Sequence, residues 1–169
     1  RPPPFATASR SGGSMVQRTM PAREPVMRPA RPEDAAQVTA LLNAEMRSFT
    51  GEDRITLEEL VHDWSQPGYT LERDCRVAEL PDGQLVAMVE FIHGDAPYVR
   101  HYSFLAIHPE LGRAEDADRL LSWLIERARE ELPAAPPDTR VNLMGGALEQ
   151  NTRMIRAWKR AGFRETRRF

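Results

Sequence analysis

The feature that most constrains this sequence is the stretch from Tyr98 to Leu121, in which a strand, a sharp turn and a helix follow one another directly. The first part alternates as a strand does, and Pro109 ends it because proline cannot donate to a sheet ladder. After a short charged turn, Leu120, Leu121 and Leu124 share one face of a helix. A strand that runs into a helix leaves free N–H groups at the helix N-terminus, where the helix dipole also favours an anion. The stretch therefore predicts a phosphate-binding turn.

The length of the chain, 169 residues, suits one domain with a hydrophobic core. Residues 1–24 differ from the rest, because they are rich in Pro, Ser, Gly and Arg and contain no acidic residue before Glu24. Such a segment cannot bury enough apolar surface to order itself, so we expect a disordered tail, a tag or a linker. An Arg- and Ser-rich start without acidic residues is also typical of an organellar transit peptide, which stays open as an alternative. The folded domain is expected over residues 25–169.

The charge of the chain excludes two classes of partner. With a net charge of −2, the protein has no excess positive charge for binding nucleic acid or an anionic membrane. No run approaches the roughly 18 apolar residues that a transmembrane helix requires. We therefore expect a soluble, cytoplasmic protein with neither nucleic acid nor a membrane as partner. The single cysteine, Cys75, falls in an expected strand and is interpreted as a core residue, with a reactive thiol as the alternative.

Hydrophobic spacing and turn residues predict the element order β-α-α-β-β-β-α-β-α-β. One helix is expected to begin at Thr56, where Glu59 completes a capping box. The segment from Pro81 to Gly83 is typical of a tight hairpin turn. The last helix should close at Gly162, and a further strand is expected from Phe163. This order predicts an α/β fold with a mixed, mostly antiparallel central sheet and helices on both faces.

Two segments resemble the GNAT superfamily, the GCN5-related, acyl-CoA-dependent N-acyltransferases. Residues 105–121, LAIHPELGRAEDADRLL, are similar to the family's V-x-P-x-x-R-G-x-G-x-G/A-x-x-L-L. Residues 151–163, NTRMIRAWKRAGF, are similar to its N-x-x-x-x-x-x-Y-x-x-x-G-F. Together with the element order, the resemblance extends from about Val26 to Phe169. The N-terminal half also resembles one half of tandem GNAT proteins of the mycothiol-synthase-like type.

The resemblance implies a GNAT-like fold and an enzyme that uses acetyl-CoA as acyl donor and a small-molecule amine as acceptor, without a metal. In this family the central strand and its neighbour splay apart, and the pantetheine arm of CoA lies between them. Carried over, Leu105, Ala106 and Ile107 would contact the pantetheine, and the Ile107 N–H would polarise the thioester carbonyl. Asn151 would contact the cofactor beside the last helix. The pyrophosphate would lie on the turn formed by Gly112, Arg113, Ala114, Glu115, Asp116 and Ala117.

The transfer also requires a base that removes a proton from the amine. His101 lies six residues before Ile107, where some relatives have a catalytic Glu, and an imidazole titrates near neutral pH. Glu90 on the preceding expected strand is a second catalytic candidate. His93 and Tyr102 are alternatives, and a purely structural His101 also stays open.

The sequence departs from the family pattern at two places. Gly112 and Arg113 reverse the family's Arg-Gly, and Glu115 and Asp116 introduce carboxylates that repel a pyrophosphate. Together with Asp118, they would stabilise the empty helix N-terminus themselves. Trp158 stands where the family often has a Tyr proposed as general acid, a role that an indole cannot fill. The alternative is therefore a degenerate, non-catalytic module, serving as a structural or ligand-sensing half of a larger protein. A homodimer or a second GNAT domain would be a compatible partner.

Overall fold

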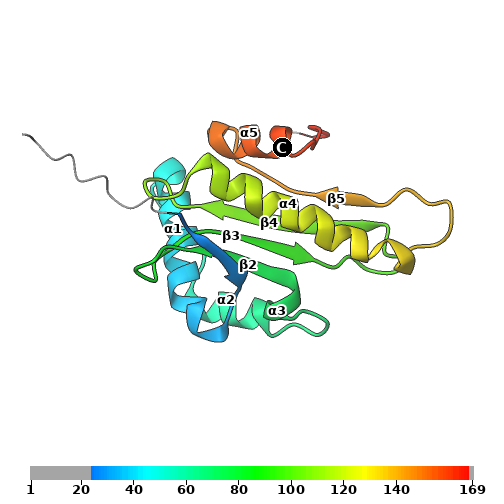
Figure 1. Cartoon of the computed structure of the whole chain (residues 1–169), viewed down its shortest axis with the longest axis horizontal. Helices are drawn as coiled ribbons and strands as arrows, with labels where there is room; N and C mark the ends of the chain where they lie inside the picture. The colour runs from blue at the N-terminus through cyan, green and yellow to red at the C-terminus, as the bar shows by residue number, and fades with distance from the viewer. Residues whose placement is uncertain (1–23, 168–169) are drawn as a thin grey trace, which may run out of the picture.

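A computed structural model describes residues 24–167 of the chain, so the expected tail lies outside the described residues except for Glu24. Five strands form one sheet in the order β1-β2-β3-β4-β5 (Figure 1). The first four strands pair antiparallel with their neighbours, whereas β5 runs parallel to β4. The strands are β1 (Val26–Pro29), β2 (Cys75–Glu79), β3 (Leu85–Ile92), β4 (Arg100–Ile107) and β5 (Asn142–Met144).

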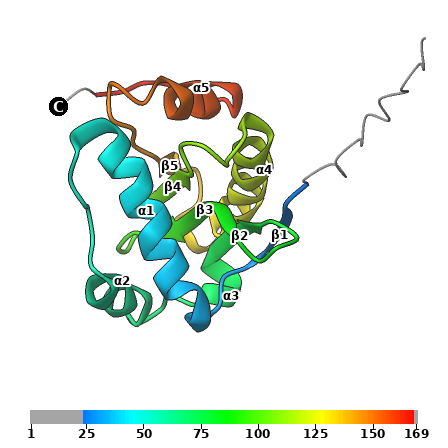
Figure 2. The same ribbon diagram turned by 90° about the vertical axis from the view of Figure 1, so that its left-hand side faces the viewer.

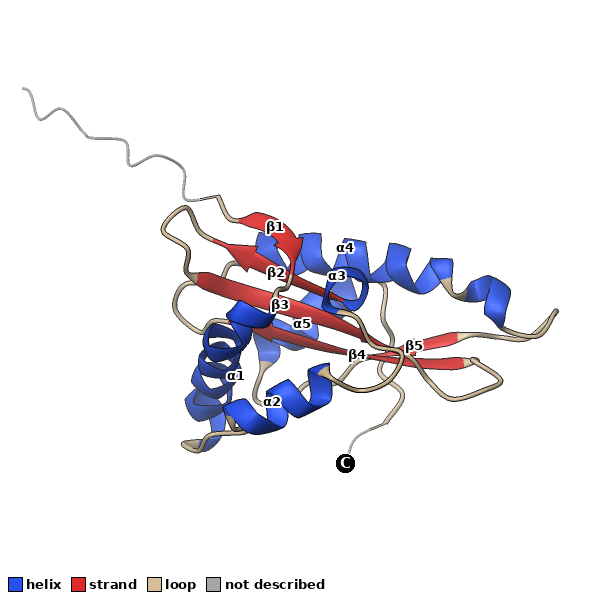
Figure 3. Ribbon diagram, turned by 90° about the horizontal axis from the view of Figure 1, so that it is seen from below, coloured by secondary structure: helices blue, strands red, loops and turns tan. Residues whose placement is uncertain are grey.

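Helices cover both faces of this sheet (Figures 2 and 3). α1 and α2 lie on one face, whereas α4 and α5 share the core on the other. This confirms the mixed, mostly antiparallel α/β architecture. None of the helices in the described part is long and apolar enough to cross a membrane. The helices are α1 (Ala35–Thr50), α2 (Leu57–Trp64), α3 (Leu71–Asp74), α4 (Ala114–Glu130) and α5 (Thr152–Arg160), with the 3-10 turns η1 (Pro32–Asp34) and η2 (Leu132–Ala134).

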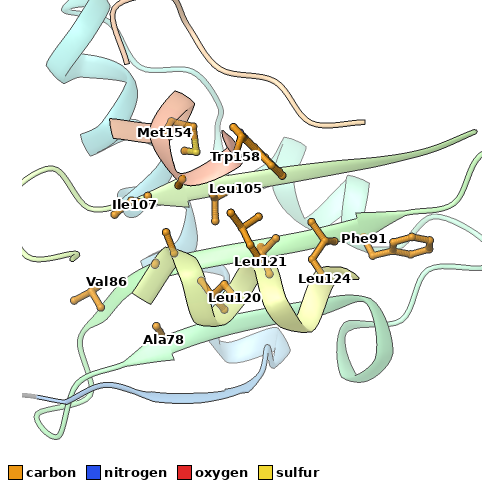
Figure 4. Close-up of a cluster of buried hydrophobic side chains, with 14 of the residues drawn as sticks. Ala78, Val86, Phe91, Leu105, Ile107, Leu120, Leu121, Leu124, Met154 and Trp158 are labelled. Carbon is orange, nitrogen blue, oxygen red and sulfur yellow. The ribbon is translucent and has the colours of Figure 1, made fainter. Parts of the chain in front are cut away.

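Each face of the sheet has its own hydrophobic core. On one face, the fully buried Leu120, Leu121 and Leu124 of α4 pack with β3, β4 and α5 (Figure 4). Burying a leucine contributes about 1.5–3 kcal/mol, so this stripe fixes α4 against the sheet. On the other face, Val38 of α1 packs in a cluster that includes Cys75, which is completely buried as expected of a core residue.

The capping box that the sequence predicts at the start of α2 is present in the structure. The Thr56 hydroxyl accepts from the Glu59 N–H at 3.2 Å, and the Glu59 carboxylate accepts from the Thr56 N–H at 2.7 Å. This is the reciprocal capping box, which satisfies donors at the start of the helix.

The strand expected from Phe163 was a wrong prediction for the described residues, which continue to residue 167 without another strand. Gly162 has a φ of +90°, and the Phe163 N–H donates back to the Trp158 carbonyl at 3.0 Å. This glycine-dependent ending folds the chain back onto α5. The Phe163 ring then packs against Trp158, with 4.6 Å between the ring centroids, instead of extending toward the sheet.

Candidate functional site

β4 and β5 pair over only a short stretch and then diverge. Their last paired positions are Tyr102 and Met144. Gly145 follows at once, and it packs so closely against the Trp158 ring that a Cβ would lie 2.5 Å from ring atoms. The chain therefore turns toward α5, and among the described residues no strand accompanies the remainder of β4 on that side.

The free edge of β4 presents the backbone groups of alternate residues. The His108 N–H donates to the Val86 carbonyl of β3 at 2.8 Å. Since backbone groups alternate in direction along an antiparallel strand, Ala106 also faces β3, whereas Leu105 and Ile107 face the free edge. The Ile107 N–H accordingly points away from β3 and donates to a carboxylate of α1. Two of the three expected pantetheine contacts are thus open to the edge, and the backbone of Ala106 is not.

The carboxylate at this edge belongs to Glu45 of α1. Its Oε1 accepts from the Ile107 N–H at 3.1 Å and from Asn151 Nδ2 at 3.3 Å. Asn151 is held in turn as the N-cap of α5, because its Oδ1 accepts from the Met154 N–H at 3.0 Å. Three elements that are distant in the sequence therefore meet at Glu45.

The surroundings of Glu45 act on its proton affinity in opposite directions. Burial raises the pKa of the Glu45 carboxyl, because a charge removed from water is less stable. The hydrogen bonds from Ile107 and Asn151, and the positive charges of Arg153 and Arg54, lower it. Sequence reasoning missed Glu45, since no motif or spacing relates it to Ile107, which lies 62 positions away.

The expected phosphate turn packs tightly against the end of β4. A Cβ on Gly112 would lie 2.5 Å from Ile107 Cγ2 and 2.7 Å from a carbonyl oxygen of β3, so the close approach requires glycine. Arg113 is the N-cap of α4, and its N–H donates to the Asp116 carboxylate at 2.8 Å. Asp116 is buried and Glu115 is exposed. Capping of this helix by one of its own carboxylates therefore occurs at Asp116.

A pocket of about 140 Å³ opens between the start of α4 and α5. Three arginines of α5 line it at positions i, i+3 and i+7, the spacing of residues on one helical face. Sequence reasoning missed this basic face, although the spacing is visible in the printed sequence. The lining residues are Ile107, Ala114, Ala117, Arg153, Arg156, Ala157 and Arg160.

Two of the three arginines already have partners. Arg160 forms an ion pair with Asp118, in which Nη2 and Nε both donate to Oδ1, at 2.8 and 3.0 Å. Arg153 donates to three carbonyl oxygens of the turn between β4 and α4 and so holds that turn in place. Arg156 has no hydrogen-bond or ion-pair partner within residues 24–167. The pocket thus offers one uncommitted guanidinium beside a helix N-terminus, a combination that suits a phosphate.

His101 lies far from this constellation. Six residues of strand separate it from Ile107, a distance of about 20 Å at roughly 3.3 Å per residue. Its side chain is fully buried, Nδ1 accepts from the Gly94 N–H at 3.3 Å, and Nε2 has no partner in the described part of the chain. Burial lowers the pKa of the imidazole. The catalytic role of His101 stays a prediction, and its complete burial argues against it.

Glu90 lies on the α2 side of the sheet. Its carboxylate accepts from Trp64 Nε1 at 2.7 Å and from the Tyr69 hydroxyl at 3.1 Å, and burial raises its pKa. Glu90 is paired with Phe104, three positions before Ile107 on β4. The structure therefore places Glu90 beside α2 rather than at the Ile107 N–H, and its catalytic role also stays a prediction.

Trp158 has a structural role in this arrangement. Its side chain is 6% exposed, and Nε1 donates to the Gly146 carbonyl at 3.2 Å. The indole thereby ties the segment after β5 to α5 and helps to keep β5 away from the end of β4.

Several solved structures have a fold similar to that of this chain. A GCN5-related N-acetyltransferase from Sphaerobacter thermophilus matches with a TM-score of 0.74 and 23% identity over 86% of this chain and 45% of its own. The protein yncA from Salmonella typhimurium, solved with its cofactor acetyl-CoA, matches with a TM-score of 0.65 and 21% identity over 85% and 82%. A ribosomal-protein-alanine N-acetyltransferase from Brucella melitensis matches with a TM-score of 0.62 and 20% identity over 83% and 85%. No protein-family model and no curated protein matches the sequence.

These likenesses define the class of fold as that of the N-acetyltransferases, and in this chain the sheet opens between β4 and β5. More particularly, the chain has the GNAT fold, as the two sequence motifs led us to expect. The chain spans about half the length of the Sphaerobacter protein.

Proposed function

We propose that this protein is an N-acyltransferase that moves an acetyl or related acyl group from acyl-CoA to a primary amine of a small molecule, by direct attack in a ternary complex. The observation that carries the proposal is the free edge of β4, which ends at Ile107 between a basic pocket and α1. A pantetheine arm contains amide groups and can pair with such an edge as an added strand does. The acetyl-CoA held by yncA supports the same ligand here.

In this proposal the Ile107 N–H is the donor that stabilises negative charge on the thioester oxygen. It is fixed by the strand and needs no rearrangement when charge develops, which is what makes such donors effective. Removing one oxyanion donor typically costs about 2.7–4 kcal/mol of transition-state stabilisation.

The arginines of α5 offset part of the negative charge at the start of α4. Asp118 is paired with Arg160, whereas Asp116 keeps its charge while it accepts from the Arg113 N–H, and Glu115 is exposed to solvent. Arg156 is free to pair with the pyrophosphate beside the start of α4. The comparisons give no support to the non-catalytic alternative.

The substitution Arg156→Ala tests the proposal. We expect it to weaken acetyl-CoA binding about tenfold or more, because a hydrogen bond to a charged group contributes about 1.5–3 kcal/mol. Isothermal titration of the full chain would measure the change. Binding of S-acetyl-pantetheine, which lacks the pyrophosphate, should be unaffected by the substitution.

Lys159→Ala is the matched control, since Lys159 is an exposed cation of the same helix that does not line the pocket. An equal loss in both variants would mean that Arg156 acts only through the overall charge of α5. Absence of acetyl-CoA binding by the unaltered chain would overturn the proposed function itself.

A further inference from the structure

The contact between Glu45 and Ile107 places an acceptor on the donor that the proposed function assigns to the thioester. A carboxylate oxygen and a thioester oxygen cannot both take the same N–H with good geometry. Glu45 must therefore leave the Ile107 N–H when the thioester enters. The bond from Asn151 Nδ2 does not involve that N–H, so it can hold the displaced carboxylate nearby.

We propose that Glu45 is the general base of the transfer: the thioester oxygen displaces it from the Ile107 N–H, and it then takes a proton from the acceptor's ammonium group. This inference rests on the proposed function. A carboxylate that leaves a donor 3.1 Å away stays within about one hydrogen-bond length of the oxygen that replaces it. The amine nitrogen must approach the carbon bonded to that oxygen, so base and nucleophile share the same small space.

The protons and electron pairs of this step balance. The ammonium R–NH₃⁺ gives one proton to the Glu45 carboxylate, and the freed lone pair of nitrogen forms the N–C bond. Collapse of the tetrahedral intermediate breaks the C–S bond, and the sulfur leaves with the electron pair. The nitrogen then loses a second proton, which the sulfur receives to give free CoA thiol. Glu45 returns its proton to water, so each turnover releases one proton.

The titration of Glu45 can be distinguished from that of the groups around it. The charges of Arg153 on α5 and of Arg54 in the segment after α1 both lower its pKa, and arginines stay charged throughout the accessible pH range. Asn151 and the Ile107 amide do not titrate. His108, in the turn after β4, is the histidine adjacent to Ile107 in the chain, and burial lowers its pKa. His108→Gln therefore serves as the control for assigning the pH profile.

The substitution Glu45→Gln tests the proposal, because it keeps the size and the hydrogen-bonding oxygen but removes the base. Thiol release would be followed between about pH 5 and pH 9 with phosphinothricin, a peptide with N-terminal alanine and 2-phenylethylamine as acceptors. We expect kcat to fall by about 10²–10⁴-fold, and the rise of kcat/KM with pH that marks the base in the unaltered protein to disappear. Acetyl-CoA affinity should change by less than about threefold.

Two controls and three outcomes complete the experiment. Glu52→Gln, at an exposed carboxylate just after α1, should retain activity, and His108→Gln should retain the rise with pH. If Glu45→Gln keeps both the activity and the pH profile of the unaltered protein, the base assignment is wrong while the proposed function stands. If Glu45→Gln instead loses acetyl-CoA binding, Glu45 is a positioning residue and the assignment is equally wrong. If the unaltered chain binds no acetyl-CoA, the proposed function fails and this inference fails with it.

Discussion

Ile107 serves both halves of the candidate site through different atoms. Its N–H faces Glu45 and α1, whereas its side chain lines the arginine pocket between α4 and α5. This division follows from strand geometry, because backbone groups lie in the plane of the sheet and side chains stand perpendicular to it. Gly112 packs against the same side chain and so fixes it from the turn.

Because the His101 imidazole is buried, we expect the free energy of unfolding to depend on pH. An unfolded histidine has a pKa near 6.5, and burial lowers the pKa in the folded state. The unfolded chain therefore binds the proton first, and the free energy of unfolding falls as the pH drops below about 6.5, by up to about 1.4 kcal/mol per pH unit. His101→Gln should flatten this acid slope in urea titrations between about pH 7 and pH 5.

The same variant decides between the two interpretations of His101. If His101 is a buried structural residue, His101→Gln should leave turnover at neutral pH unchanged and flatten the acid slope of the unfolding free energy. A strong loss of turnover with an unaltered slope would instead support the catalytic prediction.

Individual site residues differ in how far the sequence can reveal them. Ile107, Gly112 and Asn151 lie within short motifs, in which the local turn or cap already restricts the residue type. Glu45 carries no local signal, since its contact depends on where α1 packs on the sheet. The arginines, by contrast, have a helical spacing that sequence reasoning could have used.

Among the elements, α5 does most to keep the site open. It carries the basic face, and its Trp158 packs over Gly145, where the chain leaves β5. The absence of a side chain at Gly145 lets the two segments approach closely.

Gly145→Ala should destabilise the protein by about 1–3 kcal/mol, the usual cost of overpacking, because the new Cβ would meet the Trp158 ring at 2.5 Å. The neighbouring Gly146→Ala is the matched control, since a Cβ there meets nothing within 4 Å. Chemical denaturation would measure both variants. Equal stability of the two would contradict the packing described for α5.

Among the secondary-structure elements, local sequence signals predicted the ends of helices better than they predicted strands. The α2 capping box and the closing Gly162 need only a few neighbouring residues. β5 extends over three residues, and the segment after Phe163 forms no strand in the described part, because pairing depends on partners elsewhere in the chain. The hydrophobic pattern of the segment after Phe163 could not show that the Phe163 ring would pack against Trp158.

Across the whole molecule, a buried ion pair fastens the end of the sheet remote from the candidate site. Asp74, at the end of α3, accepts from Arg127 of α4 at 2.9 and 3.1 Å, and both side chains are almost completely buried. Arg127 also donates to Glu131 at 2.6 Å and lies over the Phe91 ring at 4.7 Å. These contacts join α3, α4 and β3.

Arg127→Met should cost about 3–5 kcal/mol in unfolding free energy, because it removes the guanidinium from a buried carboxylate that keeps the Thr70 N–H and His93 Nε2 as neighbours. The double variant with Asp74→Asn should recover part of this loss. Arg47→Met, which breaks the exposed pair with Asp53, should change stability by less than about 1 kcal/mol. A double variant as unstable as the sum of its single variants would show that the two residues do not interact energetically.

The fold as a whole was predictable because element order and two motifs restrict the topology strongly. The α/β class, the antiparallel majority and the helices on both faces all follow from that order. The joining of α1 to the end of β4 could not be predicted, since it depends on three-dimensional packing.

The contact with Glu45 means that the Ile107 N–H has a hydrogen-bond acceptor within the protein itself. Because that acceptor is already in place, in the proposed function the arrival of an acyl donor would replace one oxygen by another and add no new bond to that N–H. In the proposed reaction the acyl oxygen stays on the acylated amine, so Glu45 would return to the Ile107 N–H when that product departs. We therefore expect the acylated amine to leave readily, and its release should not limit the rate.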